Sequence, residues 1–179
     1  MTKKMWKVDP GHSQIGFAAK HLMIAKTRGT FDEFEARIDV DIDDLTNDPS
    51  VEIDILSSSV NSRNEKRDGH LRSEEFFDIE NHPLIKYRLK RASKIGENLY
   101  EVDGELQMRE TVKDVVFEVK LEGKATDPVS GDSVAGFSGI TTINRQDYGL
   151  SWTAGGPNGD SLIGDDIELS FELELRSKE

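Results

Sequence analysis

The stretch YEVDGELQM, residues 100–108, alternates an apolar or small residue with a polar one at every step. Successive side chains of a β-strand point to opposite faces of a sheet, so the alternation predicts a strand with one buried and one solvated face. Similar patterns occupy seven further stretches, residues 13–21, 34–42, 51–55, 85–90, 115–121, 137–143 and 167–175. Turn signals such as Gly96 before Asn98 separate most of them. The Gly-rich segment AGGPNGD, residues 154–160, is expected to be a mobile connection.

Strands that are apolar on one face only favour antiparallel pairing, because strands of parallel sheets tend to be continuously apolar. Such strands bury their apolar faces by closing a barrel or by stacking two sheets. We therefore predict an all-β fold, an antiparallel eight-stranded barrel formed by a single domain of residues 1–179. A barrel of this size has an interior that side chains fill or that holds one small ligand. Strand glycines such as Gly104 and Gly139 leave room inside or allow the strands to bend.

The block NSRNEKRDGHLRSEEFFDIENHP, residues 61–83, interrupts the alternation. Ser62 followed by Glu65 is a capping-box pattern, which predicts a short helical segment near residues 62–80, with a helix starting near Arg63. Four donors at i, i+3, i+4 and i+7 would share one face of that helix: Arg63, Lys66, Arg67 and His70. Ser73 is expected to cap a second short turn that carries Phe76 and Phe77.

Composition excludes several classes of function. The net charge of −12 argues against nucleic acid as a partner and against general affinity for anionic membranes. Cysteine is absent, which removes disulfides, thiol nucleophiles and thiolate metal sites. No stretch approaches the roughly 18 to 20 apolar residues of a membrane span, so no stable membrane insertion is expected. The N-terminus MTKKMWKVDPGHS lacks the apolar run of a secretory signal, and a cytoplasmic location is predicted.

The residues suggest neither catalysis nor a metal. Ser13 follows His12, but neighbouring residues of a strand point to opposite faces and cannot act as nucleophile and base. The spacing of the histidines fits no zinc pattern. We therefore predict no catalytic residues, no metal and no cofactor, and a protein that is not an enzyme. An enzyme would require catalytic residues that are distant in the sequence and are brought together by the fold.

Many residues, taken in order and spacing, resemble the YceI-like family of lipocalin-like, polyisoprenoid-binding proteins over nearly the whole chain. The residues that carry the resemblance are Val8, Asp9, His12, Ser13, Ile15, Phe17, Lys20, His21, Leu22, Gly29, Phe31, Arg67, Asp68, His70, Leu71, Phe76, Phe77, Asp78, Pro83, Asn144, Arg145, Asp147, Tyr148, Gly149, Gly164, Asp165 and Ile167. The resemblance implies a barrel with a long apolar tunnel that holds an isoprenoid chain, an isoprenoid quinone or another long lipid. The chain departs from the family at Glu110, Thr111 and Val112, where relatives often have a Gly-Val-Thr turn.

On this basis the expected function is to bind a long-chain isoprenoid lipid, a polyprenyl chain, a polyprenyl phosphate or an isoprenoid quinone, for carriage, storage or stress protection. The expected tunnel residues are Ile15, Phe17, Ala19, His21, Leu22, Phe31, Phe76, Phe77, Tyr87, Leu106, Met108, Phe117, Phe137, Ile143 and Tyr148. The expected head-group anchors are Arg63, Lys66, Arg67, His70 and Arg145. Two alternatives stay open. One is an enzyme acting on a lipid-like substrate, with His70 or His21 as general base. The other is a packed barrel that binds a protein partner or forms a homodimer.

Overall fold

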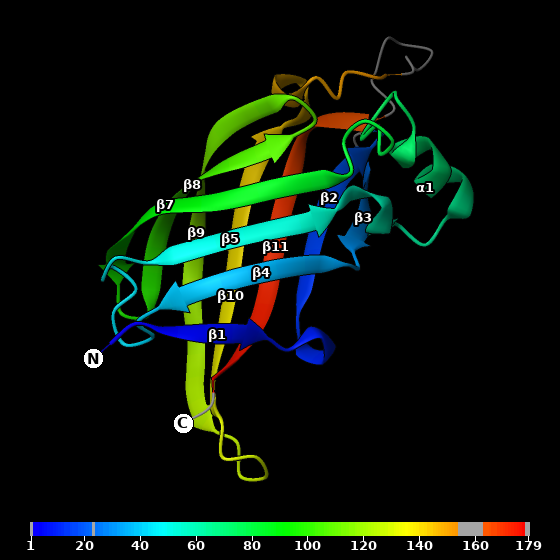
Figure 1. Cartoon of the computed structure of the whole chain (residues 1–179). Coiled ribbons are helices and arrows are strands. Elements are labelled where there is room, and N and C mark those ends of the chain that lie inside the picture. Colours follow the sequence, from blue (N-terminus) through cyan, green and yellow to red (C-terminus); the bar gives the residue numbers. More distant parts are fainter. Residues whose placement is uncertain (1, 23, 154–162, 178–179) are drawn as a thin grey trace.

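A computed structural model describes residues 2–22, 24–153 and 163–177 of the chain (Figure 1). Its strands are β1 (Lys4–Val8), β2 (Gln14–His21), β3 (Ala25–Phe31), β4 (Phe34–Val40), β5 (Ser50–Leu56), β6 (Val60–Asn61), β7 (Leu84–Gly96), β8 (Leu99–Met108), β9 (Thr111–Thr126), β10 (Ser133–Asn144) and β11 (Ile163–Ser177). The α-helix in these parts of the chain is α1 (Glu65–Arg72), and the 3-10 turns are η1 (Pro10–His12), η2 (Ser57–Ser59) and η3 (Arg145–Tyr148). The segment expected to be mobile, residues 154–160, lies outside the described residues.

Eight of the strands form a closed antiparallel ring. The order around it is β1, β4, β5, β7, β8, β9, β10 and β11, and the pairing of β1 with β11 closes it. The registers follow the alternation of the sequence, so that Tyr87 lies opposite Leu106 and both point inward. The predicted eight-stranded antiparallel barrel with one short helix is confirmed.

The three remaining strands extend the ring at the end near α1. One edge of β11 pairs first with β2, from Ile163 to Glu172, and then with β1, at Leu175 and Arg176. In the same way β3 pairs with β2 while β4 pairs with β1. Two positions of the barrel are thus each occupied by two shorter strands in succession, β2 and β1 at one and β3 and β4 at the next. The sequence pattern missed β1, β3 and β6, because these strands are short or carry mostly polar residues.

A polar cluster fixes the point where the neighbour of β11 changes. The carboxylate of Asp9 accepts from the backbone N–H of Gly11 at 3.0 Å and from Arg176 Nε at 3.2 Å. The hydroxyl oxygen of Ser13 accepts from the backbone N–H of Glu174 at 3.0 Å. Arg176 Nη1 reaches Asp127 at 2.6 Å, at the base of the β9–β10 hairpin. These contacts give Asp9 and Ser13 a structural role.

The helix differs from the capping-box prediction. It begins at Glu65, and its cap is Asn64, whose side-chain oxygen accepts from the backbone N–H of Arg67 at 3.0 Å. Ser62 instead donates its backbone N–H to the carboxylate of Asp68 at 2.9 Å, and its hydroxyl donates to the same oxygen. Because Ser62 binds the buried carboxylate of Asp68, the predicted capping box of Ser62 and Glu65 does not form. The turn at residue 73 does form, since the backbone N–H of Phe76 donates to the Ser73 carbonyl.

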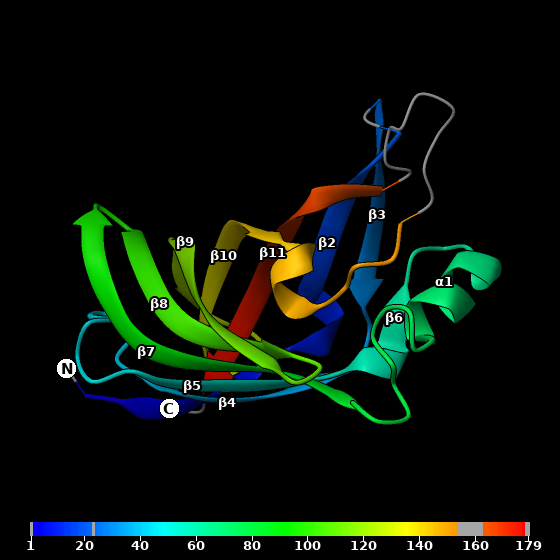
Figure 2. The same cartoon turned by 90° about the horizontal axis from the view of Figure 1, so that it is seen from above.

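The interior has two apolar clusters, one toward each end of the barrel. Trp6 and Leu45 belong to the cluster far from α1, and Phe31 and Ile85 belong to the cluster nearer to it. The loop of residues 41–49 lies at that far end and contributes the buried Leu45 to its cluster. Its buried Asp41 accepts from the backbone N–H of Asp43 at 3.0 Å. Figure 2 shows α1 beyond β6, away from the end that carries the N-terminus. No helix in the described residues is long and apolar enough to cross a membrane.

Candidate functional site

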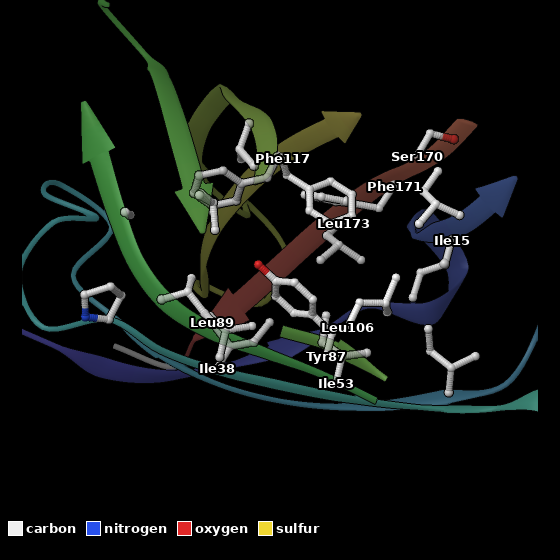
Figure 3. Close-up of a pocket in the computed structure, with 18 of the residues that line it drawn as sticks. Ile15, Ile38, Ile53, Tyr87, Leu89, Leu106, Phe117, Ser170, Phe171 and Leu173 are labelled. Carbon is white, nitrogen blue, oxygen red and sulfur yellow. The ribbon is translucent and has the colours of Figure 1, made fainter. Parts of the chain in front are cut away.

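The ring encloses an inner cavity of about 170 Å³ (Figure 3). Its wall consists almost entirely of apolar side chains from strands on all sides of the barrel. The expected tunnel residues that line it are Ile15, Phe31, Tyr87, Leu106, Met108, Phe117 and Phe137. Leu45 and Pro49, from the loop of residues 41–49, contribute to its wall. The inner cavity is therefore an apolar chamber with that loop among its walls.

An outer cavity of about 500 Å³ lies toward α1. The expected tunnel residues that line it are Phe17, Ala19, His21, Phe31, Phe76, Phe77, Met108 and Ile143. Phe31, Met108 and Leu169 line both cavities, so the two cavities are adjacent and these side chains stand between them. Exposed His21 and Lys66 also line the outer cavity, which therefore reaches the surface. We call this opening the mouth.

Polar side chains of α1 gather at the mouth. Lys66, Arg67 and His70 all line the outer cavity. Arg67 is held in place because its Nε donates to the Ser62 hydroxyl at 2.8 Å and its Nη2 donates to the Ser62 carbonyl at 2.7 Å. The His70 ring lies edge-on to Trp152, with ring centroids 4.5 Å apart. Positive charge and aromatic surface thus meet at one opening.

Arg145 has a different environment from the other expected anchors. Its side chain is only 2% exposed. Its Nη1 donates to the carbonyls of Leu150 at 2.6 Å and Trp152 at 2.7 Å, and its Nε donates to Gly164 at 3.1 Å. Its Nη2 lies 3.3 Å from the Ile163 carbonyl and 3.4 Å from Asp165. A guanidinium has five N–H groups, and four hydrogen bonds to backbone carbonyls together with the nearby Asp165 carboxylate satisfy most of them. Arg145 lines the outer cavity but holds the backbone on both sides of residues 154–162.

Three expected site residues do not line either cavity. Arg63 precedes the helix with a positive φ of 61°, so it does not share the face of Lys66, Arg67 and His70. Leu22 is 39% exposed at the connection between β2 and β3. Tyr148 is buried in the apolar cluster near α1, and this burial raises the pKa of its hydroxyl to about 12.

Some residues at the site were not expected from the sequence. Trp152 lines the outer cavity and contacts His70 and Phe76. Arg109 stands in the tight β8–β9 connection, where the departure from the family turn begins, with a positive φ of 54°. Its Nη1 lies 3.3 Å from the Phe76 carbonyl and 3.4 Å from the Gly149 carbonyl. These contacts join segments distant in sequence, and no local pattern signals them.

One group of acidic and imidazole side chains lies outside the cavities. Oxygen and nitrogen atoms of Asp9, His12 and Glu174 lie within 4.8 Å of one another. Arg176 donates to both carboxylates, at 3.2 Å to Asp9 and 2.9 Å to Glu174. The hydrogen bond that the His12 ring donates to the Asp9 carboxylate raises the pKa of His12. A guanidinium inside the group disfavours a cation by charge repulsion, and the group is therefore best described as an ion-pair cluster.

The sequence model of one protein family, described as the YceI-like domain, matches residues 6–175. A UPF0312 protein of Staphylococcus epidermidis is 34% identical over 175 residues, which cover 98% of this chain and 98% of the relative. The crystal structure of a Campylobacter jejuni YCEI protein is 30% identical, with a TM-score of 0.76, and the match covers 89% of this chain and 90% of that one.

A more distant structure shows the fold alone. It is a polyisoprenoid-binding domain from Saccharophagus degradans, described as implicated in plant cell wall breakdown. The two chains are 14% identical with a TM-score of 0.69, and the match covers 96% of this chain and 98% of that domain. The architecture of this barrel therefore persists where little sequence identity remains.

Proposed function

Because the chain belongs to the YceI-like family, we propose that it binds a long-chain isoprenoid lipid along the path formed by the inner and outer cavities. The observation that carries the proposal is the inner cavity, a chamber between the strands of the ring with an almost wholly apolar wall. Burial of apolar surface contributes roughly 0.8 kcal/mol per CH₂ group. A lipid with many such groups is therefore retained firmly. The role that we propose for the protein is carriage, storage or stress protection.

The length of the path favours a long chain. Ile167 lines the outer cavity and Leu175 lines the inner one, eight positions apart (175 − 167) on β11. Eight residues of a strand span about 26 Å. With the usual tilt of barrel strands this corresponds to about 20 Å along the barrel axis. An ordinary acyl chain reaches about 15 Å, half of a bilayer core. The path is thus longer than such a chain needs.

The mouth favours a polar or anionic head on that lipid. Lys66 and Arg67 contribute positive charge, and His70 adds a nitrogen donor beside the Trp152 ring. Charge-assisted hydrogen bonds from such groups suit a phosphate or a quinone oxygen. In this arrangement the tail occupies the inner cavity and the head stays at the mouth. The function follows from binding alone, and we propose no catalytic step.

A larger side chain that fills the inner cavity tests whether the lipid binds there. Phe137 lines the inner cavity, and Phe137→Trp adds volume there. We expect the variant to bind a polyprenyl alcohol or its monophosphate at least tenfold more weakly than wild type, while it remains folded. Val116, on the outer face of β9 and 46% exposed, offers the matched control Val116→Trp, which should bind like wild type. Equal binding by both variants would remove the inner cavity from the proposal.

The cytoplasmic location and the homodimer predicted from the sequence stay predictions. Fractionation of the source cells tests the first, and light scattering of the purified protein tests the second. Neither result changes the assignment of the tunnel, because both cavities are formed within one chain.

A further inference from the structure

The tip of the β2–β3 hairpin presents apolar side chains to solvent beside the mouth. Ile24 is 84% exposed and Leu22 is 39% exposed, and residue 23 lies outside the described residues. Leu22 also adopts a φ of +50°, a conformation that is uncommon for a residue with a branched side chain. The hairpin stands at the same end of the barrel as α1 (Figure 1). Its inward-facing residues Ala19, His21 and Thr27 line the outer cavity.

Basic side chains flank this apolar tip. Lys20 and Lys26 are paired directly across the two strands, and Arg28 lies two positions further along β3 on the same face. Like charges opposite one another destabilise a sheet. Lys26 lies 3.7 Å from Glu168, whereas Lys20 and Arg28 form no ion pair with the described residues. This cluster is conspicuous in a chain whose net charge is −12.

The β9–β10 hairpin shows that an exposed apolar tip need not carry such a cluster. Val129 is 94% exposed there. The carboxylate of Asp127 accepts from the Val129 backbone N–H at 2.8 Å, and Asp132 completes an acidic turn. Its tip also lies away from α1 and the mouth (Figure 1). Exposed apolar surface and unpaired positive charge therefore coincide at the β2–β3 hairpin and not at this other tip.

We propose that the β2–β3 hairpin docks the protein transiently on an anionic lipid bilayer, with Leu22 and Ile24 entering the interface and Lys20, Lys26 and Arg28 contacting the head groups. This inference rests on the proposed function, because docking brings the mouth against the membrane from which a lipid enters or leaves. Each basic side chain near an anionic surface strengthens binding about fivefold. The acidic remainder of the chain is repelled by the same surface, which orients the protein and keeps docking reversible.

The test measures two quantities with one set of proteins. Flotation with neutral phosphatidylcholine vesicles, and with vesicles that also contain phosphatidylglycerol, reports docking without any bound lipid. Transfer of a fluorescent polyprenyl alcohol from donor to acceptor vesicles reports exchange. The variants are Ile24→Ser and the double variant Lys26→Glu with Arg28→Glu, none of which alters a residue that lines a cavity. Val129→Ser is the matched control.

We expect wild type and Val129→Ser to float with anionic vesicles at low salt and to be released as salt rises. The charge variant should lose docking and transfer on the order of tenfold or more, and Ile24→Ser should lose several-fold. Equal flotation with neutral and anionic vesicles, or transfer that neither variant reduces, overturns the inference. If the charge variant fails to fold, the inference is tested by the flotation of Ile24→Ser and by the salt titration of wild type. Docking without any bound polyprenyl lipid would contradict the proposed function alone, and bound lipid without docking would contradict this inference alone.

Discussion

Trp6 and Trp152, the two tryptophans of the chain, stand at opposite ends of the barrel in contrasting surroundings. Trp6 is 3% exposed, and its indole N–H donates to the Val40 carbonyl at 3.3 Å. Trp152 is half-buried at the mouth, against the rings of His70 and Phe76. The end around Trp6 is a buried apolar cluster, and its packing stabilises the fold. The end around Trp152 is packed less tightly, and there the outer cavity opens to the surface.

The largest expected effect is a difference in the free energy of unfolding between variants of these two tryptophans. Trp6→Ala should lower the free energy of unfolding by about 3 to 5 kcal/mol, because it empties a buried position. Trp152→Ala should cost less than half as much in stability but weaken retention of a polyprenyl lipid. Denaturant unfolding and lipid binding of both variants check this. Equal losses of stability would contradict the division of the barrel into a packed end around Trp6 and a mouth.

Arg145 tests whether the mouth has a rigid support of its own. Arg145→Lys removes the forked contacts to the carbonyls of Leu150, Trp152 and Gly164. Leaving buried acceptors without donors should cost about 3 kcal/mol of unfolding free energy. The exposed Arg63 offers the control Arg63→Lys, which should change little. A loss in Arg145→Lys no greater than in the control would show that this support is unimportant.

A smaller effect, which depends on pH, is expected at the contact between Arg176 of β11 and Asp127. The hydrogen bond from Arg176 lowers the pKa of Asp127 to about 2 from an ordinary value of 3.8. A carboxyl with a lowered pKa stabilises the fold above its unfolded pKa, and this contribution is lost as pH falls through the folded pKa. Asp127→Asn should therefore be less stable than wild type at neutral pH. The difference should shrink between about pH 4 and pH 2.

Thermal unfolding of both proteins across this range measures the difference. Asp132→Asn, which removes a carboxylate from the same hairpin without removing the Arg176 contact, is the control. A stability difference between Asp127→Asn and wild type that stays constant down to pH 2 would contradict the role assigned to the Arg176 contact.

The same division explains what the sequence predicted well. Alternation is a local property, and it identified most of the ring, including residues 100–108, because each strand there is long and apolar on one face. Of the expected tunnel residues, all except Leu22 and Tyr148 line the two cavities. Inward-facing positions of neighbouring strands necessarily face the same interior. The alternation within each strand therefore suffices to predict which residues line a cavity.

The mouth was predicted less well, because its contacts depend on segments far apart in the chain. Asp68 takes Ser62 away from the helix cap, and this competition is invisible in a capping motif. The guanidinium of Arg145 binds the backbone carbonyls of Leu150, Trp152 and Gly164, although Arg145 was expected to anchor a head group. Arg109 and Trp152 belong to the site only because the fold brings them to Phe76.

Lipid binding in the barrel is tested most directly by organic extraction of the natively purified protein, followed by mass spectrometry. We predict a polyprenyl lipid in near-stoichiometric amount, with a phosphate or quinone head, and its loss in Phe137→Trp but not in Val116→Trp. Repeated absence of any such lipid, together with an experimental structure in which side chains fill the inner cavity, would contradict the account.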